Sequence, residues 1–239
     1  PPIEFRNVDL RYGAGLPAAL WGCSFRIQPG EKVGVVGRTG AGKSSLISAL
    51  FRLVPCCGGQ VLVGGVDVAE LPLHTLRSSI TIIPQEPTLF AGTVRQCLDM
   101  FGDHEDDRIW TALERCGLKA VVSKLPLGLQ DVVEAGGENF SVGQRQLFCL
   151  ARALLRCTSF LILDEATASV DPITDALVQR TLKEQFGGCT TLTIAHRLDT
   201  IIDCDKVLVL DGGHVVEFDT PASLLSAATQ FQDMVNQCG

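Results

Sequence analysis

The stretch Gly37-Arg38-Thr39-Gly40-Ala41-Gly42-Lys43-Ser44 matches the pattern G-x-x-x-x-G-K-[ST] and decides the fold. It follows a compact apolar run, Val33–Val36, which is typical of a buried parallel strand. A helical stretch from Ser44 to Leu53 comes directly after it. In this order of strand, loop and helix, backbone N–H groups and a helix N-terminus point at a phosphate. The sequence therefore predicts an α/β core that binds the phosphates of a nucleotide.

The loop residues have distinct predicted roles. Glycines let the backbone approach phosphate closely. Lys43 would place its charge beside the β- and γ-phosphates, and the Ser44 hydroxyl would contact Mg²⁺. The predicted nucleotide contacts here are Gly37, Arg38, Thr39, Gly40, Ala41, Gly42, Lys43, Ser44 and Ser45.

The spacing of apolar residues differs along the parts of the chain on either side of the loop. Apolar residues alternate along residues 3–12 and 23–27, which is typical of half-buried antiparallel strands. From Thr93 to about Leu155 the periodicity is helical. We expect one domain, residues 1–239. Its nucleotide-binding core with a parallel sheet and an N-terminal antiparallel β layer would occupy residues 1–88 and 156–239. The helical subdomain would be inserted at residues 89–155.

The C-terminal part shows three further signals. Asp171-Pro172 has the side chain and the proline that begin a helix. Asp211-Gly212-Gly213 lies between two apolar runs and predicts a hairpin. A last helix is expected from about Pro221 to Val235.

Two acids end the apolar run Phe160–Leu163. A carboxylate at a strand end suits a contact with Mg²⁺, the role predicted for Asp164. Glu165 would then orient or deprotonate the attacking water. Without the phosphate loop, a solvated acid pair at a strand end would be the preferred explanation of both residues. His196 follows another predicted strand and would hydrogen-bond the γ-phosphate, although a lone histidine is more often structural.

Two more residues have a structural alternative, which for Gln85 is the one that spacing alone favours. Gln85 follows a β-rich run ending at Ile83, where its amide would contact Mg²⁺ and the water; an ordinary loop glutamine fits the spacing too. Tyr12, the only tyrosine, would stack on a nucleobase, and it fits equally an aromatic residue on the apolar face of a strand.

The run Ser141-Val142-Gly143-Gln144 opens an amphipathic helix. A serine N-cap and a glycine at a helix start form an anion site. Because the phosphate loop already supplies one helix end, a second anion site suggests a nucleotide held across a dimer interface. A plain helix cap is the alternative.

Composition sets further bounds. With 46% hydrophobic residues the chain can bury a core, and its net charge of −7 argues against a nucleic-acid partner. Ten cysteines without a C-x-x-C pair indicate free thiols in a reducing compartment. No apolar run reaches the roughly 20 residues of a membrane helix. The start at Pro1 without a methionine indicates an excerpt of a longer protein.

Together these motifs resemble the nucleotide-binding domain of an ABC transporter, and specifically the second domain of the C subfamily, the multidrug-resistance-associated proteins. The resemblance implies ATP and Mg²⁺ as ligands, and Ser44, Gln85 and Asp164 as Mg²⁺ contacts. It implies base stacking by Tyr12 and a dimer-facing loop at Asp171. The implied catalytic residues are Lys43, Gln85, Glu165 and His196. The implied partner-site signature is Ser141, Val142, Gly143 and Gln144.

The resemblance also implies partners and a location. A second, unequal nucleotide-binding domain would pair head to tail with this one, and transmembrane domains would place it at the cytoplasmic face of a membrane. Val142 departs from the glycine of the usual signature, so the site that this signature completes should hydrolyse poorly. Export of organic anions, conjugates or drugs is the implied function. A nucleotide sensor that controls a channel is the alternative, and a soluble ATPase acting on DNA fits the acidic charge poorly.

Overall fold

A computed structural model describes residues 1–164, 171–194, 198–226 and 229–238. Its contacts divide the chain into two compact units. Unit 1 comprises Pro1–Ile80, Ser159–Ile162 and Cys189–Gly239, and unit 2 comprises Thr81–Thr158 and Leu163–Gly188. The chain passes between the units within two strands and at two loops, and each unit is described by itself.

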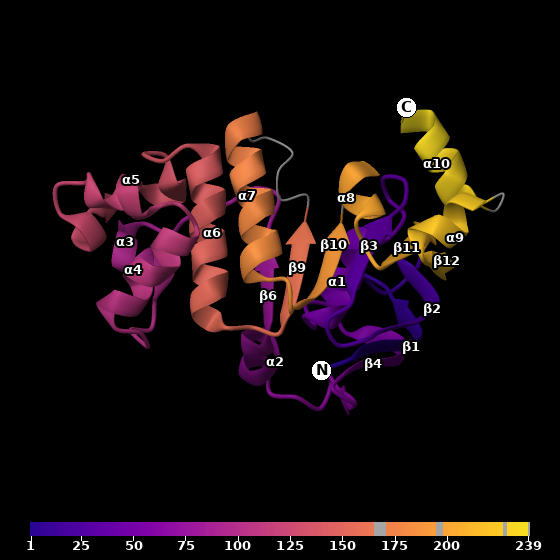
Figure 1. Ribbon diagram of the computed structural model, residues 1–239. Coiled ribbons are helices and arrows are strands. Elements are labelled where there is room, and N and C mark those ends of the chain that lie inside the picture. The colour runs from indigo at the N-terminus through magenta and orange to yellow at the C-terminus, as the bar shows by residue number, and fades with distance from the viewer. Residues whose placement is uncertain (165–170, 195–197, 227–228, 239) are drawn as a thin grey trace. The chain divides into compact units, whose positions relative to one another are not determined.

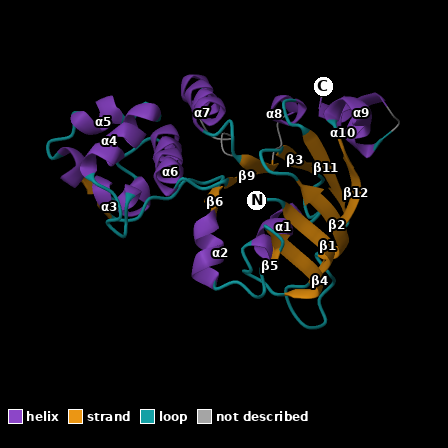
Figure 2. Ribbon diagram, turned by 60° about the horizontal axis from the view of Figure 1, so that its bottom comes forward, coloured by secondary structure: helices purple, strands orange, loops and turns teal. Residues whose placement is uncertain are grey.

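The first sheet of unit 1 is antiparallel, as the alternating N-terminal pattern predicts. Its strand order is β2-β1-β4-β5, and Figure 2 shows β2, β1 and β4 side by side. The strands are β1 (Ile3–Leu10), β2 (Leu20–Ile27), β4 (Cys56–Val63) and β5 (Val66–Asp67). Phe5 pairs with Phe25 on the neighbouring strand, and their rings stack with centroids 4.5 Å apart. The alternation therefore encodes one buried face.

The second sheet is the parallel core. Among the described residues its strand order is β12-β11-β3-β10-β9-β6. The strands are β3 (Lys32–Val36), β6 (Ile80–Ile83), β9 (Phe160–Asp164), β10 (Thr190–Ile194), β11 (Lys206–Asp211) and β12 (His214–Asp219). β3 lies parallel to both β10 and β11, and β12 returns antiparallel after the predicted hairpin turn. The predicted α/β fold with a parallel sheet is confirmed.

Helix α1 (Lys43–Leu50) carries the end of the phosphate loop, and it ends earlier than the sequence indicates. Leu46 and Leu50 are each 1% exposed and belong to the core of unit 1. Burying a leucine contributes about 1.5–3 kcal/mol, so apolar packing holds this helix in place. Helices α2 (Leu73–Ser79) and α8 (Leu198–Ile202) were not expected from the sequence pattern.

The expectation of one last helix is wrong. The chain forms α9 (Pro221–Ser226) and α10 (Gln230–Cys238), seen as separate coils in Figure 1. The Thr229 hydroxyl accepts the N–H of Gln232 at 3.1 Å, which starts the second helix. The Glu217 carboxylate of β12 accepts the N–H of Gln230 at 2.6 Å. Both bonds satisfy N–H groups that a continuous helix would have used internally.

Unit 2 is mostly helical, as the periodicity predicts. Its helices are α3 (Val94–Leu98), α4 (Asp106–Arg115), α5 (Lys119–Ser123), α6 (Val142–Arg156) and α7 (Pro172–Gln185), with short turns η1 (Gly128–Gln130) and η2 (Ala135–Gly137). A small sheet of β7 (Gly92–Thr93) and β8 (Val132–Val133) was not expected. Helices α6 and α7 lie side by side (Figure 1). Unit 2 thus extends beyond residues 89–155 to include α7.

Candidate functional site

The glycines at both ends of the phosphate loop are required by close packing. A Cβ on Gly37 (φ +156°) would lie 2.4 Å from the carbonyl oxygen of Leu210 in β11. A Cβ on Gly42 (φ +106°) would lie 2.7 Å from the carbonyl oxygen of Ala19. Both distances are shorter than real Cβ contacts. Any other residue at these positions would push the loop away from Leu210 and Ala19.

Backbone hydrogen bonds hold the middle of the loop. The Ala41 carbonyl accepts the N–H of Gly213 at 3.1 Å, and the Gly213 carbonyl accepts the N–H of Trp21 at 2.9 Å. Gly213 belongs to the turn between β11 and β12. The hairpin turn predicted from Asp211-Gly212-Gly213 therefore supports the phosphate loop.

Lys43 lies within the loop that precedes it. The Lys43 residue is only 9% exposed. Its Nζ donates to the Gly37 carbonyl at 2.6 Å and to the Arg38 carbonyl at 3.2 Å. Carbonyl oxygens of the loop thus hold the ammonium at the place where a phosphate would need a cation, while Ser44 is exposed. These residues fit a nucleotide phosphate, and the Ser44 hydroxyl is an oxygen ligand of the kind that Mg²⁺ binds.

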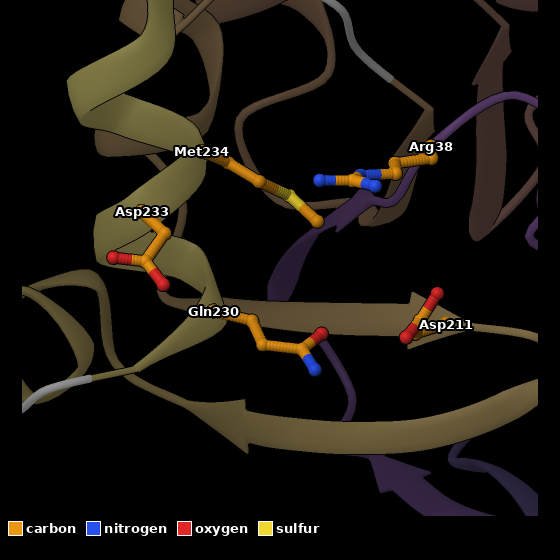
Figure 3. A pocket seen from close by; sticks show the side chains of 5 residues that line it. All are labelled: Arg38, Asp211, Gln230, Asp233 and Met234. Atoms are coloured by element: carbon orange, nitrogen blue, oxygen red, sulfur yellow. The ribbon is translucent and has the colours of Figure 1, made fainter.

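Arg38 turns its side chain elsewhere. Figure 3 shows its guanidinium extending toward Met234 of α10, while Gln230 extends toward Asp211. Together with Asp233 these residues line a pocket of about 280 Å³. The nucleotide contact predicted for Arg38 stays a prediction, and its side chain lines this pocket.

Tyr12 follows β1 rather than ending it, because the strand stops at Leu10. Its residue is 53% exposed, yet its hydroxyl lies 3.1 Å from Ser45 Oγ and 3.3 Å from Ser48 Oγ on α1. Sequence reasoning did not single out Ser48. Its spacing from Ser45 puts both hydroxyls on one face of a helix, but only the fold shows that Tyr12 reaches that face.

Gln85 and Asp164 both belong to unit 2. Gln85 is exposed just after β6, and Asp164 is the half-buried last residue of β9. Gln85 thus follows a strand and Asp164 ends one, as predicted, while their contact with Mg²⁺ stays a prediction. Glu165 and His196 lie outside the described residues. Among the residues that are described, no group of His, Cys, Asp and Glu side chains has the arrangement of a metal-ion cage.

The signature run begins helix α6 with a reciprocal cap. Ser141 Oγ accepts the N–H of Gln144 at 3.2 Å, and Gln144 Oε1 accepts the N–H of Ser141 at 3.0 Å. Val142, the first residue of the helix, is half-buried, and Gly143 is buried. Because both side-chain oxygens accept bonds within the cap, the Ser141 hydroxyl proton and the Gln144 amide protons are available to an anion.

Asp171 caps α7, as predicted. Its Oδ1 accepts the N–H of Thr174 at 3.0 Å. Hydrogen bonds from the side chain and backbone of Thr174 lower the pKa of Asp171 below its ordinary value. The carboxylate therefore remains charged at the helix N-terminus, where the helix dipole favours it.

Comparison with known proteins agrees with these motifs. The family model described as ABC transporter matches residues 20–168. ATP-binding cassette sub-family C member 2 of Rattus norvegicus is 52% identical over 99% of this chain, which covers 15% of that protein. ATP-binding cassette sub-family C member 3 of Homo sapiens is 53% identical over 99% of this chain, which covers 16% of that protein. The probable multidrug resistance-associated protein lethal(2)03659 of Drosophila melanogaster is 55% identical, with 18% covered.

A solved structure, a bacterial Atm1-family ABC exporter with ATP bound, matches the fold with a TM-score of 0.92 at 31% identity. The match covers 100% of this chain and 42% of the exporter chain. The chain thus spans less than a fifth of these curated relatives and under half of the exporter chain. Of the helices described, none has both the length and the apolar composition to cross a membrane. The chain belongs to the ABC transporter family and is a nucleotide-binding domain of its C subfamily.

Proposed function

We propose that this domain binds ATP with Mg²⁺ and hydrolyses it, as one of two paired nucleotide-binding domains, to power transmembrane export of organic anions, conjugates or drugs. The observation that carries the proposal is the position of Lys43 in the phosphate loop. Its Nζ donates hydrogen bonds to the loop carbonyls of Gly37 at 2.6 Å and Arg38 at 3.2 Å. The lysine ammonium is a hydrogen-bond donor with a positive charge, so a phosphate oxygen is the kind of acceptor that it suits. The names of the relatives supply the transport context.

Different residues of this chain would bind the phosphates, activate the water and hold Mg²⁺. Lys43 and the loop N–H groups bind the phosphates and stabilise the charge that develops during transfer. Glu165 orients the attacking water and takes up its proton, and His196 hydrogen-bonds the γ-phosphate. Ser44, Gln85 and Asp164 would hold Mg²⁺, which neutralises phosphate charge when bound.

The capped start of α6 would serve the nucleotide of the partner. Ser141 and Gln144 present hydrogen-bond donors once their oxygens are used in the cap. Val142 adds a β-branched side chain where the usual signature has glycine, and this keeps the backbone farther from phosphate. We therefore expect the site that Val142 completes to be the slower one. Val142→Gly should raise turnover of ATP by the paired domains, and unchanged turnover would refute this asymmetry.

The proposed partners lie outside this chain. They are a second, unequal nucleotide-binding domain and the transmembrane domains, with the pair at the cytoplasmic face of a membrane. The small share of each relative that the chain covers supports such neighbours. Within the chain, we propose that residues 1–88 and 156–239 form the ATP-binding core and that residues 89–155 form the helical subdomain.

Nucleotide binding is tested by titrating the 239-residue chain with MgATP in a calorimeter. Lys43→Ala should weaken binding at least roughly tenfold, because a charge-assisted hydrogen bond contributes about 1.5–3 kcal/mol. Lys119→Ala is the matched control, since this lysine pairs with Glu114 on the surface. Equal affinity of the unchanged chain and Lys43→Ala would refute the assigned phosphate site.

Coupling to transport is tested in inside-out membrane vesicles that contain the protein carrying this chain. ATP-dependent uptake of a glutathione-conjugated dye, lost in the Lys43→Ala variant, is the expected result. If no uptake occurs and ATP and ADP instead control the opening of a channel, the function is nucleotide sensing and not export.

A further inference from the structure

The hydroxyl of Tyr12 joins a chain of hydrogen bonds on helix α1. It lies 3.1 Å from Ser45 Oγ and 3.3 Å from Ser48 Oγ. Ser48 Oγ in turn donates to the carbonyl oxygen of Ser44 at 3.1 Å. This series of hydrogen bonds therefore ends at the carbonyl oxygen of Ser44, the residue that follows Lys43.

One arrangement of protons satisfies all the hydrogen bonds among these three hydroxyls and the Ser44 carbonyl. A carbonyl oxygen can only accept, so the Ser48 proton is committed to the Ser44 carbonyl. Ser48 Oγ must then accept the Tyr12 proton, and the Tyr12 oxygen is left to accept the proton of Ser45. Ser45 is 6% exposed, so its hydroxyl needs such a partner. The three hydroxyls thus have a fixed direction of donation.

The loop that carries Tyr12 is held independently at its base. The Ala19 N–H donates to the Leu10 carbonyl at 2.8 Å, and Arg11 Nη1 donates to the Leu16 carbonyl at 3.3 Å. These bonds fix the loop as a whole but not the direction of the Tyr12 ring. The bonds to α1 fix the far end of the ring, while 53% of the residue stays exposed for a ligand.

We propose that Ser45 and Ser48 are positioning residues that hold the Tyr12 ring in place to receive the adenine base of ATP. The inference rests on the proposed function, in which Tyr12 stacks on the base. It goes further, because it ties the base-binding ring to the same helix turn that carries Lys43 and Ser44. A ring fixed before the nucleotide arrives loses less conformational freedom on binding.

The test compares two ligands on the 239-residue chain by calorimetry: MgATP, and Mg²⁺ with inorganic tripolyphosphate, which has the phosphates but no base. Tyr12→Phe keeps the ring and removes the hydroxyl. Its Kd for ATP should rise roughly threefold to tenfold, the range expected for one lost hydrogen bond. Its Kd for tripolyphosphate should change less than about twofold.

Serine variants separate the anchor from general effects on a helix. Ser48→Ala should raise the Kd for ATP, and in the Tyr12→Phe background it should add almost nothing, because the two changes remove the same contact. Ser78→Ala is the matched control. Ser78 Oγ donates to the His74 carbonyl at 2.8 Å within α2, as Ser48 Oγ donates to the Ser44 carbonyl within α1. We expect no change in affinity for that control.

Each contrary outcome has a distinct meaning. If the chain binds ATP and Tyr12→Phe binds it equally well, the anchor is refuted while the proposed function stands. Equal weakening of ATP and tripolyphosphate would also refute it, because the hydroxyl would then act on the phosphate loop. If the unchanged chain binds neither ligand, the proposed function fails and this inference fails with it.

Discussion

Gly143 of α6 lies directly against Thr174 of α7. A Cβ built on Gly143 would be 2.4 Å from Thr174 Cγ2 and 3.2 Å from its hydroxyl oxygen. The two helices therefore approach at their first turns as closely as a glycine allows. Since Thr174 also donates its N–H to Asp171, the start of the signature helix and the cap of α7 are fixed together within unit 2.

This contact predicts that Gly143→Ala destabilises the chain by about 1–3 kcal/mol, the usual cost of overpacking. The better helix propensity of alanine, at most about 1 kcal/mol, does not offset the clash. Adding Thr174→Ser should recover most of the loss, because serine lacks the γ-methyl group and keeps the hydroxyl. Urea denaturation measures both effects.

Gly188→Ala is the matched control for this pair, because nothing lies within 4 Å of a Cβ at Gly188. Its stability should stay within about 0.5 kcal/mol of the unchanged chain. If Gly143→Ala were as stable as this control, the close approach of α6 and α7 would be wrong.

The cap at Asp171 predicts a dependence on pH. Because the pKa of Asp171 is lowered in the folded state, its contribution is present above the unfolded pKa and is lost as pH falls through the folded pKa. Asp171→Ala should lower the denaturation midpoint at pH 7, and the difference from the unchanged chain should shrink in acid. Asp171→Asn keeps a capping oxygen, so it should retain more of the stability at pH 7. A difference that persists undiminished in acid would contradict the assignment.

Burial raises the pKa of the Cys116 thiol to about 12. The native state therefore keeps this thiol protonated at pH values where the unfolded chain has ionised it. Stability contributed by Cys116 should be full below about pH 9 and fall as pH rises toward 12. Cys116→Ala is expected to be less stable at pH 7 but to lose less stability between pH 9 and 11. Parallel pH profiles for the two proteins would contradict this.

The same difference should appear in chemical reactivity. At pH 8, iodoacetamide should label the exposed Cys57 and Cys157 quickly and Cys116 only after unfolding, because the thiolate is the reactive form. Mass spectrometry of the labelled peptides measures the rates. Rapid labelling of Cys116 in the folded chain would show that its surroundings are open to water.

Local signals in the sequence predict most of the core but not its long-range contacts. The strand before Gly37, the loop and the hairpin turn at Asp211 each have a short pattern with one structural solution. The break before α10 depends on Glu217 of β12, which accepts the N–H of Gln230, and no local pattern reveals that partner. The contact of Gly143 with Thr174 is hidden for the same reason.

The candidate site shows the same limit. The residues of the phosphate loop follow from its motif, and Lys43 donates to the carbonyl of Gly37 within that loop. The anchoring of Tyr12 by Ser48 requires knowing that the loop after β1 reaches α1. A pattern with period two indicates a strand and a face, and it contains no information on what a loop contacts across the fold.

The role of Glu165 as the residue that activates water is the central claim about activity, and one measurement tests it most directly. In the protein that carries this chain, ATP binding and turnover are measured for Glu165→Gln, with Glu70→Gln, an exposed acid after β5, as control. The account predicts that Glu165→Gln keeps ATP affinity and loses turnover by roughly 10²-fold or more, as removal of a general base does. Turnover equal to that of the unchanged protein would contradict it.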